Sequence, residues 1–301
     1  MWRFIFLLVI TVPAFTQDAD MTFSEAYAQY QSSVEAGNLD EALPYAKLAY
    51  QLGETTYGPD HKNTASLTYN YGRTLLETKH YGEATEILKI AYKRYEKIYG
   101  KKSPNLIDPL MMQGHASAIP DQRPKKRFYD RAIKLAKETG NRGLVATLNY
   151  DAGFRLTEQA RSLDGHKYLK DAYNLYLTDL GPDNRQTASV AFFLGKVEMG
   201  RLNNDAAKKL FLQAIKGLPP ENGLVQTSHA MLVRLYMQEG DAEGIATHCL
   251  VASHLPNMNQ ICGSSPQTAI SGKQPRKVTQ IGQPTTILDP PELKERRREQ
   301  L

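Results

Sequence analysis

The sequence predicts an all-α fold, an α-solenoid of about six helix pairs, and two observations support this prediction. An alanine-rich helical pattern returns six times at intervals of about forty residues, and a second small residue follows the centre of each copy by seven positions. A fixed period of this length is typical of stacked arrays, in which each unit buries its apolar face against its neighbours. The centres of the six copies are Ala42, Ala84, Lys125, Gly165, Ala207 and Ala242, and the second small residues are Ala49, Ala91, Ala132, Ala172, Ala214 and Cys249.

Each copy predicts two antiparallel helices joined by a short loop. In the second copy, Leu67, Tyr71 and Leu75 recur at helical spacing within residues 65–79, and a second amphipathic stretch covers residues 83–99. The loop at residues 80–82 is too short for any arrangement other than side-by-side antiparallel packing. Small residues at the crossing point let the two helix axes approach closely.

The linkers between copies repeat as well. The tripeptide Gly58-Pro59-Asp60 returns 123 residues later as Gly181-Pro182-Asp183, and each is followed shortly by a Thr-Ala-Ser sequence. Glycine terminates one helix, proline cannot continue it, and an Asp or Thr oxygen is expected to cap the next helix.

This pattern resembles the tetratricopeptide repeat family. The family places small residues at the eighth, twentieth and twenty-seventh positions of its helix-turn-helix, and the second and fifth copies match with Gly72, Ala84 and Ala91 and with Gly195, Ala207 and Ala214. The period of about 41 with Gly-Pro-Asp in the linker resembles the longer repeats of kinesin light chains. The resemblance covers roughly residues 22–254 and implies a right-handed solenoid. Three copies depart from the pattern, at Tyr30, Lys125 and Ala230.

The resemblance also implies a binding surface. In this family a peptide or a partner helix usually lies in the concave groove lined by the first helix of each pair. Carrying over the groove-facing positions gives the candidates Tyr69, Arg73, His115, Tyr150, Phe154, Phe192 and Lys196. The alternative is that the aromatic residues pack between adjacent helices as core. We hypothesise a groove centred on Tyr69, Arg73, Tyr150, Phe154 and Lys196.

The first nineteen residues are typical of a secretory signal. Arg3 precedes the apolar run Phe4–Ile10, and Pro13-Ala14 provides a small-residue exit. The alternative is an uncleaved anchor, although the apolar run is short for a bilayer, which needs about 20 residues. We expect a periplasmic or secreted protein, with a Gram-negative periplasm favoured, that has no stable membrane insertion after cleavage.

Residues 255–301 are rich in Pro, Ser and Gln and carry several basic residues, which predicts a disordered tail after an array ending at residue 254. Similar exported arrays are sometimes followed by a TonB-like domain, so an accessory role in a TonB-type transport system is an alternative function. This tail lacks the alternating strand pattern of that domain. The abrupt change of composition also fits a truncated or frame-shifted gene.

Two cysteines, Cys249 and Cys262, lie late in the chain. After export they could form a disulfide, or Cys249 could fill a small-residue packing position while Cys262 lies in the tail. Their neighbours His248 and His254 do not complete the tight ligand pairs that zinc sites use, and we predict no metal and no cofactor.

Motifs for catalysis and for phosphate binding are absent from the sequence. The net charge of +5 is too mild to predict a nucleic-acid partner. We therefore predict a non-catalytic scaffold whose partner is a protein or peptide. The alternatives are a hydrolytic enzyme that uses the groove, and a structural protein that assembles weakly with itself.

Overall fold

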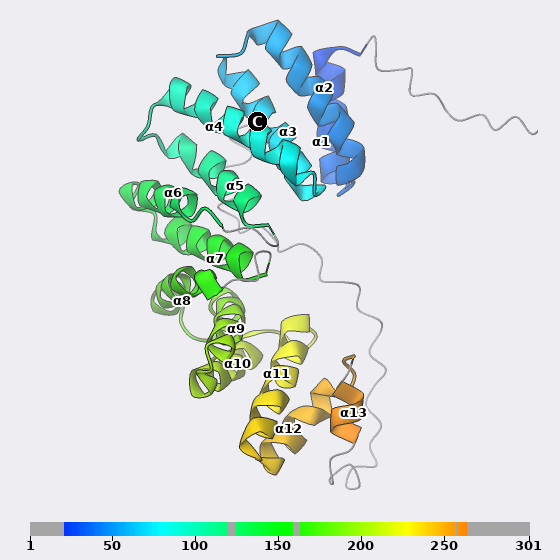
Figure 1. Cartoon of the computed structure of the whole chain (residues 1–301), viewed down its shortest axis with the longest axis vertical. Helices are drawn as coiled ribbons and strands as arrows, with labels where there is room; N and C mark the ends of the chain where they lie inside the picture. The colour runs from blue at the N-terminus through cyan, green and yellow to red at the C-terminus, as the bar shows by residue number, and fades with distance from the viewer. Residues whose placement is uncertain (1–20, 120–123, 159–162, 257, 264–301) are drawn as a thin grey trace, which may run out of the picture. The chain divides into compact units, whose positions relative to one another are not determined.

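A computed structural model describes residues 21–119, 124–158, 163–256 and 258–263, and the regular secondary structure within these ranges is entirely helical. The predicted signal segment, residues 1–19, therefore lies outside the described residues. Six helix pairs follow one another along the chain, as predicted (Figure 1). They are α1 (Phe23–Glu35) with α2 (Leu39–Tyr57), α3 (Lys62–Glu77) with α4 (Tyr81–Tyr99), α5 (Ile107–Ser117) with α6 (Arg127–Glu138), α7 (Arg142–Glu158) with α8 (His166–Leu180), α9 (Arg185–Gly200) with α10 (Asn204–Gly217), and α11 (Gly223–Glu239) with α12 (Ala242–Ala252).

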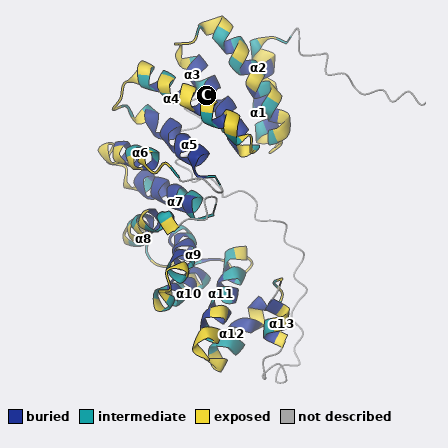
Figure 2. Cartoon of the chain, viewed as in Figure 1, coloured by how far each residue is buried: buried dark blue, intermediate teal, exposed yellow. Residues whose placement is uncertain are grey.

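Three short helices complete the described chain: η2 (Pro104–Leu106), η3 (Leu163–Gly165) and α13 (Met258–Gly263). The chain divides into two compact units, residues 1–87 and 88–301, and the boundary falls within α4. In each unit the buried residues face the neighbouring helices, and the exposed residues lie on the outer faces (Figure 2). None of the helices within the described ranges is long and apolar enough to cross a membrane.

The predicted small residues lie where the helices of a pair cross. A Cβ atom added at Gly195 of α9 would lie 3.0 Å from the ring of Phe211 on α10, and one at Gly153 of α7 would lie 2.6 Å from the side chain of Leu169 on α8. Contacts this short leave no room for a larger side chain. The glycines therefore allow the close crossings that the sequence predicted.

The linkers end helices as predicted, but they begin the next helices differently. Gly58 and Gly181 terminate α2 and α8 with φ angles of 83° and 85°. The caps of α3 and α9 are the side chains of His61 and Asn184, which accept hydrogen bonds from the backbone two residues later. The prediction of Asp or Thr caps was wrong here, because His61 and Asn184 hold the extended position next to the first helical residue.

The hydroxyl of Thr64 instead bonds backwards. It donates to the carbonyl oxygens of Gly58, at 2.6 Å, and of Gly53, at 3.2 Å. Thr64 thereby ties the start of α3 to the end of α2 within the first unit.

The helical array continues beyond the predicted end at residue 254. Helix α13 covers Met258–Gly263, and a disulfide joins Cys262 to Cys249 of α12. Met258 and Cys262, one helical turn apart, are 1% and 3% exposed and pack with Val233 and Ala252. The start of the tail predicted at residue 255 is therefore too early, because an apolar pair that covers one turn is too short to be recognised as a helical period in the sequence. Residues 264–301 of the predicted tail lie outside the described residues.

Candidate protein-binding surface

The seven predicted groove residues belong to two different units. Tyr69 and Arg73 lie on α3 in the first unit. The other five lie in the second unit: His115 on α5, Tyr150 and Phe154 on α7, and Phe192 and Lys196 on α9. We describe the two sets separately.

In the first unit, Arg73 and Tyr69 are largely withdrawn from solvent. The guanidinium of Arg73 donates to the hydroxyl of Tyr30 at 3.5 Å and lies 3.9 Å from the carboxylate of Glu77, and its side chain is 12% exposed. Burial acts to lower the pKa of Arg73, but the surrounding Tyr30 and Glu77 raise it overall, so the guanidinium stays charged. Tyr69 is 3% exposed and belongs to the core.

In the second unit, His115 lies inside the array. The imidazole is 4% exposed, its Nε2 lies 3.0 Å from the carboxylate of Asp151 on α7, and its ring centroid is 5.7 Å from that of Tyr129 on α6. Burial raises the pKa of Tyr129 well above its usual value, and the charge of Asp151 adds to this effect. His115 thus joins three helices, which is a packing role.

Aromatic residues of α7 and α9 form a cluster. The ring of Phe154 meets the ring of Phe193 edge to face, with centroids 4.9 Å apart, and Tyr150 lies 5.9 Å from Phe193. Tyr150 and Phe154 are partly buried, and both side chains pack against the hydrophobic core of this unit. Phe192 points inward, where it is 3% exposed and packs against Phe211.

Phe193 was not among the predicted residues. Its signal was the Phe192-Phe193 doublet: adjacent residues on a helix point in directions about 100° apart, so the two rings cannot both face the same neighbour. Phe193 is the ring on which Tyr150 and Phe154 rest.

A salt bridge borders this cluster. The ammonium of Lys196 on α9 lies 2.6 Å from the carboxylate of Glu158 on α7, and the two side chains are 31% and 30% exposed. The ammonium is also 5.9 Å from the ring centroid of Phe192, within range of a cation–π contact. Burial raises the pKa of Tyr150, with further contributions from Tyr176 and nearby carboxylates, so its hydroxyl stays protonated and can donate a hydrogen bond.

We call Tyr150, Phe154, Glu158 and Lys196 the aromatic surface. It offers two partly exposed rings, a hydroxyl donor and a fixed pair of opposite charges on two packed helices. Such a combination can bind an apolar side chain and a polar group of the same partner. Among the described residues, no group of three or more His, Cys, Asp or Glu side chains is placed to hold a metal ion.

Comparison with known proteins identifies the repeats. Residues 31–97 match the model of the tetratricopeptide repeat. The clustered mitochondria protein homolog of Aspergillus clavatus is 24% identical over 159 residues, which are 53% of this chain and 10% of that protein. The homolog of Coccidioides immitis is 25% identical over 173 residues, covering 53% of this chain and 13% of that protein. This chain therefore spans about a tenth of the length of these curated relatives.

A solved structure supports the fold. The assembly chaperone of RpL4, Acl4, aligns with 81% of this chain and 94% of its own, with a TM-score of 0.51 and 14% sequence identity. At that identity the likeness concerns the fold alone. Residues 31–97 thus match the tetratricopeptide repeat, and the succession of six helix pairs is similar in fold to this solved helical-repeat structure.

Proposed function

We propose that this protein is an exported, non-catalytic scaffold that holds a peptide or a partner helix against the aromatic surface. The observation that carries the proposal is the pair of half-buried rings, Tyr150 and Phe154, beside the Lys196–Glu158 salt bridge. Tetratricopeptide repeats are a helical-repeat scaffold for protein–protein interaction, and repeat arrays of this kind offer extended binding faces.

The aromatic surface is organised before a partner arrives. The buried ring of Phe193 packs against the rings of Phe154 and Tyr150, and the salt bridge to Glu158 restrains Lys196. A partner would therefore lose little conformational entropy at these side chains on binding. A helix with apolar residues at i and i+4 could cover the two rings, while an acidic side chain or a carbonyl accepts a hydrogen bond from Lys196.

Export is part of the proposal. The disulfide between Cys249 and Cys262 supports it, since structural disulfides persist in oxidising compartments and are rare in the cytosol. The apolar pattern of residues 4–10 supports it independently. Mass spectrometry of the protein recovered from each cell fraction tests the location: we expect an exported form that begins after the predicted signal, and an intact cytosolic form would contradict export.

The binding proposal is tested by crosslinking capture from an extract of the compartment that contains the protein. The wild type is compared with Phe154→Ala and with Lys196→Ala, and Lys216→Ala serves as the matched control, because Lys216 also forms a salt bridge in the second unit but lies on α10, away from the aromatic surface. We expect a partner that both aromatic-surface variants lose and the control retains.

Equal capture by all four proteins would reject the aromatic surface as the binding site. Thermal melting of each variant provides the folding check, because a lost partner is informative only where the melting temperature of the variant matches that of the control.

A further inference from the structure

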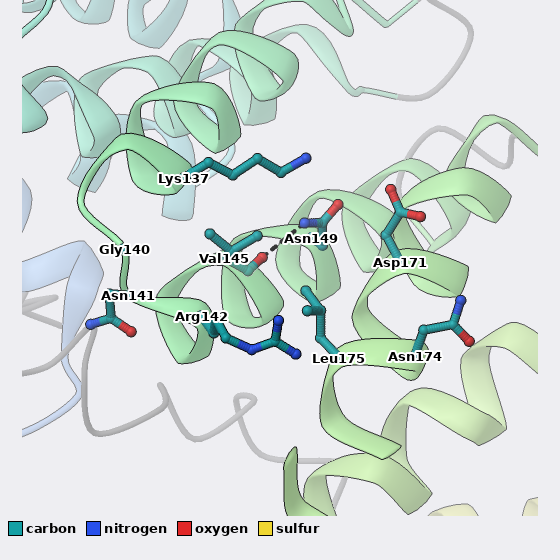
Figure 3. A pocket seen from close by; sticks show the side chains of 9 residues that line it. All are labelled: Lys137, Gly140, Asn141, Arg142, Val145, Asn149, Asp171, Asn174 and Leu175. Atoms are coloured by element: carbon teal, nitrogen blue, oxygen red, sulfur yellow. Dashed lines mark hydrogen bonds between the residues drawn. The ribbon is translucent and has the colours of Figure 1, made fainter. Parts of the chain in front are cut away.

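A hollow lies in the second unit among α6, α7 and α8. Its volume is about 430 Å³, within the range of ligand pockets (Figure 3). Val145 and Leu175 supply apolar lining, and Asn149 of α7 adds an amide. Asn149 and Tyr150 are neighbours in sequence, but Asn149 lines this hollow, whereas Tyr150 belongs to the aromatic surface.

The border of the hollow carries two charges that no neighbour neutralises. Lys137 of α6 and Asp171 of α8 both line it, and neither makes an ion pair or a side-chain hydrogen bond within the part of the chain that the structure describes. The third charged side chain of the lining, Arg142 of α7, pairs instead with Asp179 of α8 at 2.9 Å. Of the three charged side chains that line the hollow, Lys137 and Asp171 are therefore the two that remain available to a ligand.

The amides of the hollow also have unused capacity. The side-chain nitrogen of Asn149 donates to the carbonyl of Val145 at 2.8 Å, which leaves the amide oxygen and a second N–H. Asn149 is 2% exposed, and Figure 3 shows its oxygen turned away from Val145 on the side of Asp171. Asn174 of α8 adds an exposed amide that makes no side-chain hydrogen bond within the described ranges. A side-chain amide carries a donor and an acceptor together, which matches a peptide group.

We propose that this hollow is a second binding site, separate from the aromatic surface, for a short polar peptide segment that carries both a cationic side chain and a carboxylate. The cation pairs with Asp171, the carboxylate pairs with Lys137, and a peptide group between them bonds to Asn149 and Asn174. Val145 and Leu175 contact the aliphatic parts of the segment. A phosphate ligand is disfavoured by the unpaired carboxylate of Asp171, and a sugar by the absence of an aromatic ring among the lining residues.

The test is a titration of ¹⁵N-labelled protein followed by NMR. The probe is the tripeptide Arg-Gly-Glu with both ends blocked, and the reference peptide is Gln-Gly-Gln blocked in the same way. We expect the charged peptide to shift the side-chain amide signals of Asn149 and Asn174, with the neutral peptide binding at least about tenfold more weakly, because it offers no charge-assisted hydrogen bond.

Two matched pairs of variants locate the site. Asp171→Asn is expected to weaken binding of the charged peptide at least about tenfold, whereas Asp205→Asn, at an exposed carboxylate of α10, leaves the affinity unchanged. Lys137→Gln is expected to weaken binding of the charged peptide to a similar extent, whereas Lys134→Gln on the same helix leaves the affinity unchanged. The thermal melts of all four variants should match that of the wild type, since the substituted side chains are not buried.

Four outcomes would overturn the proposal. Equal affinity for the neutral peptide would remove the role of the charges, and unchanged binding by Asp171→Asn and Lys137→Gln would place the peptide elsewhere. Inorganic phosphate that binds at the hollow, and binds more tightly to Asp171→Asn, would make it an anion site instead. Shifts confined to Phe154 and Lys196 would reject the hollow but leave the proposed scaffold function in place, so the two proposals fail separately.

Discussion

The α9/α10 pair and the α11/α12 pair are held together by different forces. In α9/α10 the closest crossing is apolar: Gly195 receives the ring of Phe211, which is completely buried, with Ala207 and Ala214 buried beside it. This pair matches the repeat pattern at all three of its small positions.

The α11/α12 pair departs from the pattern, with Ala230 at the glycine position, and uses polar and covalent contacts instead. The Nδ1 atoms of His229 and His248 lie 2.9 Å apart, the ring of Tyr236 stacks on His248, and the disulfide joins α12 to α13. Apolar packing depends little on pH and redox state, whereas imidazoles and disulfides depend on both. The stability of the last pair should therefore respond to solution conditions that leave α9/α10 unchanged.

The largest expected effect tests the apolar pair. Phe211→Ala removes a fully buried ring and should lower the free energy of unfolding by about 3–5 kcal/mol. Leu212→Ala is the control, because Leu212 follows Phe211 on α10 but is 44% exposed, and it should cost less than about 1 kcal/mol. Urea unfolding followed by circular dichroism measures both. Equal losses for the two variants would contradict the assignment of the α9/α10 stability to the crossing.

The next effect concerns the disulfide. Replacing both Cys249 and Cys262 by Ala should destabilise α12 and α13 by about 3 kcal/mol, the loop-closure value for a separation of 13 residues. Amide hydrogen exchange measures this region by region, and treating the oxidised wild type with a reductant should give the same pattern. The amides of α9 and α10 provide the internal control, because neighbouring pairs in an array open separately. A uniform loss of protection across both pairs would contradict the comparison.

The contrast between the two pairs also shows what the sequence could predict. Small residues at a fixed spacing predicted the helix pairs and the close crossings, because only small side chains fit where two axes meet. That rule depends on spacing alone, so it could be applied without knowing the neighbours. It could not place α13 or the caps at His61 and Asn184, which depend on a few local contacts.

The binding surface was harder to predict for a related reason. Arg73 and Lys196 hold the same position in their repeats, yet their side chains are 12% and 31% exposed. Arg73 contacts Tyr30 and Glu77, whereas Lys196 meets only Glu158 among carboxylates in the described residues. Periodicity assigns a residue to a helix face, but the residues opposite decide whether it reaches solvent.

The histidine pair gives a smaller effect with a defined direction. Burial, and then the neighbouring His248, lower the pKa of His229 from 6.5 to about 4, and burial also lowers the pKa of His248. The unfolded chain thus binds protons at these histidines that the folded chain does not, so their contribution to stability should be complete above about pH 6.5 and fall as the pH falls from about 6.5 to about 4. We expect a loss of about 1–2 kcal/mol from His229, reduced from the full shift because the ring is half-exposed.

The measurement is the free energy of unfolding as a function of pH for the wild type and for His229→Gln. The variant should lose less stability between pH 6.5 and pH 4, since glutamine does not titrate. The Phe211→Ala protein should keep the slope of the wild type, because the α9/α10 crossing contains no imidazole. Identical slopes for wild type and His229→Gln would show that other groups dominate acid unfolding.

The smallest expected effect on stability is at the aromatic surface. The salt bridge between Lys196 and Glu158 is partly exposed, and such pairs contribute at most about 1 kcal/mol. Lys196→Gln should therefore leave the free energy of unfolding in urea nearly unchanged while it weakens binding of the captured partner. Lys216→Gln, which breaks a more exposed salt bridge to Asp183, should change neither the stability nor the binding. A loss of stability above about 2 kcal/mol in Lys196→Gln would mean that the residue is structural. A side chain that the fold does not need, held in place by its neighbour, is the kind of group that a partner can use.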